Sequence, residues 1–368
     1  QVARVPTWLP SMLAEFFVAY LQPYLPTPVV RVLVRWYLYL FVGWRMRSGD
    51  VVVRQIKLDR QERTRAPVTT EVEVTNEQLY ANDPAFFVAH LGPRLKYSAC
   101  EWPVNCGAST SDPPSCAAAL ADAEALTLAT YQERLGLASL PAGSRVLECG
   151  CGWGSLTLTN AARFPKLHFV AFSNSPQQIE YVAKTAAERG LANVSMHVED
   201  YALFVDPATS KVAPAGCAPF DAAVAIETVE HAQNIKELLA AVAARLRPGG
   251  RFFVHSLLHQ SASYLVDADS WMGRNFFTGG SIISLNSYFH LCPPSLHLAD
   301  VTPVSGEGYA KTLLAWLARM EPQRAALVAK YGAPFYEGFR MFYLSCAEAF
   351  AANRGAEYMC GYYLFVKR

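Results

Sequence analysis

Short apolar runs alternate with amphipathic segments through the middle of the chain. Five apolar runs, each long enough for one buried strand, lie at 144–150, 167–173, 193–200, 220–227 and 251–259. Three segments with helical periodicity lie between them, at 155–164, 175–190 and 235–250. Strands that alternate with helices across tight turns are typical of a parallel, doubly wound sheet. The pattern therefore predicts an α/β fold with a mostly parallel sheet.

The regions around this core have other patterns. A helix rich in Ala, Leu and Glu is predicted at 116–137, after a loop at 103–116 that contains prolines and cysteines. Residues 260–310 are aromatic and lack a regular period, so we expect irregular structure there. Residues 311–353 predict two helices, and 359–368 predict a closing strand.

The N-terminal region is apolar but has no run of about 18 apolar residues, the length that a spanning helix needs. Its longest apolar stretch, 29–44, is interrupted by Arg31 and Arg35, and five prolines between residues 6 and 28 exclude one long helix. Either a pair of apolar helices packs on the body of the protein, or the segment is a surface anchor with arginines at the membrane interface. Residues 5–45 are thus the expected place for membrane contact or protein assembly.

Composition narrows the functional classes. Apolar residues make up 52% of the sequence and charged residues 17%, which provides material for a large core. With 32 Lys and Arg against 31 Asp and Glu, the net charge of +1 would not attract nucleic acid, so no such partner is expected. Nine cysteines without CxxC spacing predict no metal site and an intracellular, reducing compartment, either cytoplasm or organelle. The sequence begins with Gln1 rather than Met, which allows for a removed leader.

The most informative motif is the turn from Glu148 to Gly154, ECGCGWG, which follows a predicted strand and opens a predicted helix. Glycines at such a turn let the backbone approach a ligand closely. The GxGxG spacing lacks the continuation of the GxGxxG motif that holds a dinucleotide pyrophosphate. A tight GxGxG loop after an acidic residue instead suits the amino-acid end of S-adenosylmethionine (SAM). A plain strand-to-helix turn would not require three glycines in five residues.

The ends of the next strands support a cofactor site, since a doubly wound sheet binds ligands at the carboxyl ends of its strands. The second predicted strand ends at Ser173 and Asn174, with Gln178 one turn later, and these neutral side chains could bind ribose hydroxyls. The third ends near Asp200, which could accept a hydrogen bond from the adenine amino group. Ser175 and Asp200 could equally serve as helix N-caps.

Six stretches of the sequence carry a family resemblance: VLECGCGWGS, SNSPQQ, IETVEH, FFVHSLLH, WMGRNFFTGG and GYAKTLLAWLARM. Together they resemble the cyclopropane-fatty-acyl-phospholipid synthase and mycolic acid methyltransferase superfamily, and within it the plant coclaurine N-methyltransferase type. The resemblance extends over about residues 26–368. It implies a Rossmann-like class I SAM-dependent methyltransferase fold, with a doubly wound, mostly parallel sheet, an N-terminal helical extension and an inserted helical lid. It also implies SAM as the cofactor.

On this basis the sequence divides into four parts. They are an N-terminal apolar helical extension (1–75), a lid and cofactor-covering segment (76–140), the SAM-binding core (141–260), and a substrate lid with closing strands (261–368). Residues 103–116 and 206–219 resemble insertions into the family pattern.

Positions that match family motifs supply the expected cofactor site. Tyr97 and Ser98 match the Tyr-Ser pair at the methionine end of SAM, and Ile226 ends the strand near which the transferred methyl group would project. The expected cofactor-binding residues are Tyr97, Ser98, Glu148, Gly150, Gly152, Gly154, Ser173, Asn174, Gln178, Asp200 and Ile226.

Glu230 and His231 match a Glu-His pair that faces the amine in the N-methyltransferases of the family, and Glu227 matches a nearby acid. An amine must be neutral to attack a methyl sulfonium, so a side chain has to take or steer its proton, and such a pair suits that task. Alternatively, Glu230 and His231 only begin the next helix. The first interpretation implies N-methylation of a small amine.

A lipid acceptor would need a different base. Methyl transfer to an alkene makes a carbocation, and in the lipid enzymes of the family a bound bicarbonate takes the proton. Glu230, His255 and Tyr309 match the positions that would hold this anion, so bicarbonate is expected only with a lipid acceptor. His255 and Tyr309 could otherwise satisfy each other in the core. The family motif Y-S-C-x-Y/F-F is altered, because Cys100 is displaced by one position and Glu101 replaces an aromatic residue.

Aromatic residues are abundant in the substrate half, where a cage of rings would suit a cationic amine product. The expected acceptor-binding residues are Tyr80, Phe276, Phe339 and Phe342, although such rings could equally form the core of the lid. We therefore predict a SAM-dependent methyltransferase that acts on a small amine. The alternatives are an enzyme that methylates or cyclopropanates lipid acyl groups at carbon, and a silent SAM-binding subunit of a larger assembly.

Overall fold

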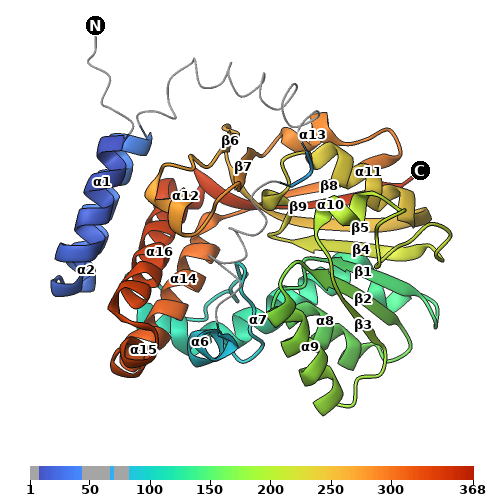
Figure 1. Ribbon diagram of the computed structural model, residues 1–368, viewed down its shortest axis with the longest axis horizontal. Coiled ribbons are helices and arrows are strands. Elements are labelled where there is room, and N and C mark those ends of the chain that lie inside the picture. The colour runs from blue at the N-terminus through green and yellow to red at the C-terminus, as the bar shows by residue number, and fades with distance from the viewer. Residues whose placement is uncertain (1–7, 44–66, 70–82) are drawn as a thin grey trace, which may run out of the picture.

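The computed structural model of the protein describes residues 8–43, 67–69 and 83–368 (Figure 1). Five parallel strands form the centre of its sheet, in the order β3-β2-β1-β4-β5. Their bounds are β1 (Arg145–Cys149), β2 (His168–Ser173), β3 (Val194–Val198), β4 (Phe220–Ile226) and β5 (Leu246–His259). The predicted doubly wound, mostly parallel sheet is confirmed.

Strands β1, β2 and β4 are buried at most positions because both faces of the sheet are covered. The polypeptide runs outward from β1 to β3 and then crosses back to lay β4 on the other side of β1. The carboxyl ends of β1 and β4 therefore lie next to each other, at the point where the direction of winding changes. Open α/β sheets bind their ligands at this point.

Helices pack on both faces of the sheet (Figure 1). On one face, Tyr131 and Leu135 pack with Val146 and Phe253 of the strands. On the other face, a second cluster joins the sheet to the helices after β3 and β4. The helices that connect or cover the central strands are α7 (Pro113–Leu135), α8 (Ser155–Arg163), α9 (Pro176–Glu188), α10 (Tyr201–Val205) and α11 (Ile235–Arg245). The helix predicted at 235–250 ends early because Leu246 already pairs with Phe220 as the start of β5.

The sheet continues into the region that was predicted to be irregular, so that prediction is wrong in part. The added elements are β6 (Tyr264–Leu265), α12 (Trp271–Asn275), β7 (Ser281–Ser284), α13 (Ser287–Leu291) and β8 (Leu296–Val304). The predicted closing strand, β9 (Tyr358–Lys367), lies antiparallel between β5 and β8. Asp300 and Pro303 depress the strand propensity of β8. Pairing with β9 overrides that propensity, and β8 accepts its proline because β9 is its one partner strand in the described sheet.

Three long helices, not the predicted two, follow β8. They are α14 (Gly306–Met320), α15 (Arg324–Tyr331) and α16 (Ala333–Ala351). Gly332 separates the last two, because its φ of 88° lies in the left-handed region that ends a helix. Together with α7 and α6 (Pro84–His90), these helices build an aromatic core beside the sheet (Figure 1).

Two helices of the N-terminal region, α1 (Trp8–Phe16) and α2 (Thr27–Tyr37), lie on the outer side of the helical layer, where α2 packs on α16 and α1 contacts α12 (Figure 1). Polar contacts hold α2 there. Arg31 and Arg35 both donate to the buried carboxylate of Glu348, at 2.5 and 2.8 Å. Gln22, between the two helices, donates to the Glu337 carboxylate at 3.0 Å. In the described residues, no helix has the length and apolar character needed to cross a membrane.

Removing the carboxylate that holds α2 should loosen the N-terminal helices. We expect Glu348→Ala to lower the free energy of unfolding by about 2 kcal/mol, because two arginines lose a shared buried partner and only Arg35 is well exposed to water. Chemical denaturation measures this change, and limited proteolysis shows whether cleavage moves to the α1–α2 segment. Glu307→Ala, an exposed acid on α14, is the control. Equal stability of the two variants would contradict the expected role.

Candidate active site

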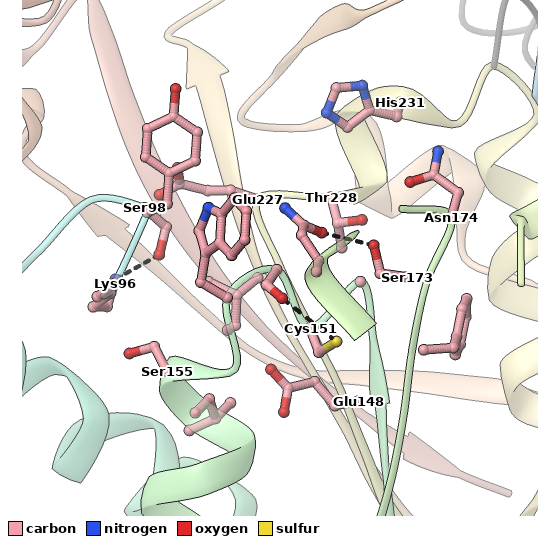
Figure 2. Close-up of a pocket in the computed structure, with 18 of the residues that line it drawn as sticks. Lys96, Ser98, Glu148, Cys151, Ser155, Ser173, Asn174, Glu227, Thr228 and His231 are labelled. Carbon is pink, nitrogen blue, oxygen red and sulfur yellow. Dashed lines mark hydrogen bonds between the residues drawn. The ribbon is translucent and has the colours of Figure 1, made fainter. Parts of the chain in front are cut away.

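Two cavities lie where the carboxyl ends of β1 and β4 meet. The glycine-loop cavity is lined by residues of all the central strand ends from β1 to β4, including Asp200 and Ile226. Figure 2 shows two more of them, Glu148 and Ser173. The aromatic cavity has a volume of about 260 Å³ and lies beneath α12, α14 and α16. Tyr97, Glu227 and His231 line both cavities, so the two share a wall. Ligands in the two cavities would meet at these three side chains.

The glycine loop has the geometry of a cradle. Gly150, Gly152 and Gly154 all have positive φ, at 75°, 52° and 78°. A Cβ on Gly150 would lie 2.3 Å from the Thr228 hydroxyl, whereas one on Gly152 would meet nothing within 4 Å. Gly150 and Gly152 line the cavity, but Gly154 does not. It caps α8 and packs against Val182 instead.

The other ten expected cofactor-binding residues all line the glycine-loop cavity. The Ser173 hydroxyl donates to the Gln178 side-chain oxygen at 2.7 Å, which leaves the buried Gln178 Nε2 without a partner among the described residues (Figure 2). Asp200 caps α10 by accepting from the Ala202 N–H, and its carboxylate also accepts from the Thr69 hydroxyl. Asp200 is therefore both a cap and a lining residue.

Buried polar atoms remain without partners at the glycine loop. Trp153 Nε1 and Ser155 Oγ make no hydrogen bond in the described structure, and both residues line the cavity. Burial raises the pKa of Glu148 to about 8, although a hydrogen bond from the Thr157 hydroxyl opposes this. Buried donors without partners cost free energy unless a ligand satisfies them. The loop thus fits a ligand that carries several hydrogen-bond acceptors.

Glu227 stands at the junction of the two cavities in a strained conformation. Its φ of 49° is unusual for a residue other than glycine, and such strain is concentrated at functional sites. Its backbone N–H donates to the His255 carbonyl at 2.7 Å, and its carboxylate accepts from the Ala99 N–H at 2.7 Å. Burial raises the pKa of Glu227 to about 7, and the positive charge of Lys96 opposes that rise.

Glu230 and His231 lie on a short 3-10 turn, Val229–His231. The next helix, α11, begins later and is capped by Asn234, so the two residues do not open it. Glu230 Oε1 accepts from the Leu257 N–H at 2.5 Å, and the buried Oε2 has no partner among the described residues. Burial raises the pKa of Glu230 to about 8, and the charge of Glu227 adds to this effect. Burial lowers the pKa of His231 to about 4.

His255 and Tyr309 do not pair, so that expectation is wrong. His255 Nδ1 lies 2.6 Å from the hydroxyl of Tyr131 on α7, and His255 lines neither cavity. Tyr309 lines the aromatic cavity, where its ring packs edge-on against Phe350. The three residues expected to hold bicarbonate therefore do not converge on one cavity.

The three expected acceptor residues that the structure describes are divided between two cavities. Phe276 and Phe342 line the aromatic cavity, and their rings stack with centroids 4.6 Å apart. Phe339 packs edge-on behind Phe276 and lines a separate groove beside Val18. Tyr80 lies outside the described residues. Two rings of the expected set thus face the same cavity as Glu230.

One cluster could admit a metal ion. Glu227, His255 and Cys360 bring one ligand atom each within 4.8 Å of one another, the one such group in the described part of the protein. Lys96 places positive charge beside it, which lowers the pKa of both Glu227 and His255. Since this ammonium would repel a cation, we assign no metal to the cluster.

Several residues of the site were missed by sequence reasoning. Lys96 and Thr228 line the glycine-loop cavity, and Tyr131 holds His255. Lys96 could have been found from its place directly before the Tyr-Ser pair. Tyr131 lies on a helix far away in the sequence, so only the fold brings it to the site.

The five parallel strands, the acid before the GxGxG loop and the cavity at the change of winding define a class I SAM-dependent methyltransferase. The sequence profile of the family "Mycolic acid cyclopropane synthetase" matches residues 69–357. The chain belongs to this family.

Named relatives are similar over most of the sequence. The (S)-coclaurine N-methyltransferase of Thalictrum flavum subsp. glaucum is 26% identical over 359 residues, 93% of this protein and 92% of the relative. The cyclopropane-fatty-acyl-phospholipid synthase of Escherichia coli (strain K12) is 28% identical over 218 residues, 58% of this protein and 52% of the relative. A crystal structure of coclaurine N-methyltransferase with N-methylheliamine and S-adenosylhomocysteine (SAH) has the same fold, with a TM-score of 0.81, 24% identity and coverage of 97% and 99%. The protein is a SAM-dependent methyltransferase.

Two glycine substitutions should separate folding from cofactor binding. We expect Gly150→Ala to lower the melting temperature, because its Cβ would clash with Thr228 and its φ disfavours a side chain. Gly152→Ala should cost only about 1–2 kcal/mol of stability but weaken SAH binding, because its methyl group points into open space of the cavity. Thermal denaturation and calorimetric titration with SAH measure the two effects. Unchanged SAH affinity of Gly152→Ala would contradict this assignment of the cavity.

Proposed function

We propose that the protein transfers a methyl group from SAM to the nitrogen of a hydrophobic amine held in the aromatic cavity. The observation that carries this proposal is the pair of carboxyl groups of Glu230, which is buried, and Glu227, whose side chain is 7% exposed; both face a cavity lined mainly by apolar and aromatic side chains. Similarity to N-methyltransferases over most of the sequence supports it.

The glycine-loop cavity would hold the cofactor, which supplies an electrophilic methyl group on its sulfonium. The amine forms its bond to this methyl group as the bond to sulfur breaks, so the reacting atoms must be aligned across the shared wall. Glu227 at that wall offers a negative charge near the developing ammonium. We propose that Glu230, whose Oε2 is free to accept, takes the proton from the amine.

His231 is suited to positioning rather than to carrying charge. Because burial lowers its pKa to about 4, the imidazole is neutral at physiological pH. Its ring packs edge-on against Phe277, with centroids 5.1 Å apart, at the boundary of the two cavities. A neutral ring there can orient the amine through a hydrogen bond without repelling it.

The lining of the aromatic cavity indicates the class of acceptor. No Lys or Arg is among its described lining residues, so it has no partner for a carboxylate or phosphate on the acceptor. Stacked rings such as Phe276 and Phe342 favour a flat or cationic group. We therefore propose a hydrophobic amine of alkaloid type. The lipid alternative is less well supported, because His255 lies outside the cavity.

A conservative change at Glu230, the proposed base, should abolish the pH dependence of methylation. Using labelled SAM and a series of tetrahydroisoquinolines, we expect methylation to rise with pH through about 8, as Glu230 loses its proton. Glu230→Gln should lower kcat by about 100-fold or more and remove this rise. Glu188→Gln, an exposed acid on α9, is the control. Label in acyl lipids instead of the amine, or full activity of Glu230→Gln, would refute the proposal.

We further propose that the outer side of α1 and α2 rests on an anionic membrane surface. Twelve large apolar or aromatic side chains between residues 12 and 40 are exposed, among them Phe16, Tyr20, Trp36 and Tyr39. On α2, by contrast, the side chains of Arg31 and Arg35 reach back to Glu348 of α16, which is the reverse of a helix whose charged face meets water. Trp and Tyr favour the membrane interface, and the sequence from 44 to 66 has seven Lys and Arg against three Asp and Glu.

This surface adjoins the acceptor site, because Leu38, directly after α2, lines the aromatic cavity. A hydrophobic amine that partitions into a bilayer would then enter from the membrane side. We expect the protein to float with vesicles that contain phosphatidylserine, and Trp36→Glu to prevent this. Phe289→Glu, at an exposed ring on α13, should float normally. Absence of flotation, or a stable dimer that Trp36→Glu dissociates, would overturn the proposal.

A further inference from the structure

Lys96 is a buried ammonium without a carboxylate partner. Its residue is only 2% exposed, and Nζ donates to the Ser98 hydroxyl at 2.7 Å and to the Ala99 carbonyl at 2.6 Å. No carboxylate oxygen lies within 4.0 Å of Nζ among the described residues. Burying an unpaired charge is costly, so a group that occupies the site in function is expected to balance it.

The direction of the hydrogen bond indicates where that group binds. An ammonium has only hydrogens to offer, so the Ser98 oxygen must be the acceptor. The hydroxyl hydrogen of Ser98 therefore points to another acceptor, and none of the described residues supplies one. Figure 2 shows Lys96 and Ser98 together at the edge of the glycine-loop cavity. The positive charge of Lys96 strengthens Ser98 as a donor toward the cavity.

A third donor lies on the same side of the cavity. Ser155 opens α8, directly after the glycine loop, and its buried hydroxyl has no partner in the described structure (Figure 2). The N-terminus of a helix also carries partial positive charge. This corner of the cavity thus combines a cation, two hydroxyl groups and a helix N-terminus, all of which favour an anion.

SAM has one negative group, the carboxylate of its amino-acid end, and two positive groups. Lys96 is the one Lys or Arg among the described residues that line the cavity, whereas Glu148, Glu199, Asp200 and Glu227 also line it. We infer that Lys96, acting through the Ser98 hydroxyl, is the counter-charge that positions the carboxylate of SAM. This role deepens the cofactor assignment and does not depend on the acceptor.

Lys96 could instead act only on the protein, since its charge also lowers the pKa of Glu227. The two roles can be distinguished by removing the carboxylate from the ligand. Decarboxylated SAH keeps the nucleoside, the sulfur and the amino group. A purely structural role of Lys96 would affect both ligands equally, whereas a counter-charge would affect only SAH.

The experiment measures the binding of SAH and decarboxylated SAH to the full-length protein by calorimetry. We expect Lys96→Met to weaken SAH about 10- to 100-fold and decarboxylated SAH less than about 3-fold. Ser98→Ala should weaken SAH selectively as well, and Lys96→Arg should recover part of the affinity. Lys184→Met, an exposed lysine on α9, is the matched control and should bind both ligands normally.

Stability provides a second readout. Because Lys96→Met removes a buried charge, its melting temperature without ligand should not fall, while the rise on adding SAH should shrink. If Lys96→Met does not fold, Ser98→Ala alone decides between the two roles. Equal losses for SAH and its decarboxylated analogue, or no loss for either, would overturn the inference.

Discussion

The parallel pairing of β4 with β1 is the constraint on which the site depends. Because β2 and β3 lie on one side of β1 and β4 and β5 on the other, no crossover covers the carboxyl ends of β1 and β4. The glycine loop leaves β1 there, and Glu227 follows β4. Both cavities begin at these two strand ends. The glycine loop and the carboxyl groups of the aromatic cavity are therefore neighbours for a topological reason, not through their own interactions.

Charge is concentrated in a poorly solvated volume at this junction. Burial keeps the pKa values of Glu148, Glu227 and Glu230 well above those of exposed carboxyl groups. Lys96 supplies the opposing charge but forms no close ion pair with the described residues. Such an arrangement is costly for the protein without ligand and is balanced when a ligand with both positive and negative groups binds. SAM has this pattern of charges.

The helical layer separates the two tasks of the enzyme. Residues 96–102 form a loop that is held by Thr127 on α7 and Thr312 on α14, so the helices position the residues that face the cofactor. Of these two helices, α14 also encloses the aromatic cavity, together with α12 and α16. Buried acids on α16 hold the N-terminal helices, whose segment reaches that cavity at Leu38. The aromatic cavity thus combines parts from distant regions, while the glycine-loop cavity is built mainly from consecutive strand ends.

The sequence by itself determined the elements whose signals are local. Periodicity and tight turns located β1 to β5, and the spacing of three glycines located the turn with positive φ after β1, because a positive φ there depends on the residue itself. Tertiary structure decided the rest. β8 forms against its own propensity because β9 pairs with it. His255 bonds to Tyr131 rather than to Tyr309, because α7 packs on the sheet above it. Lys96 is an unusual lysine only because folding removes it from water. Contacts between residues far apart in sequence leave no local pattern, so only the folded protein shows them.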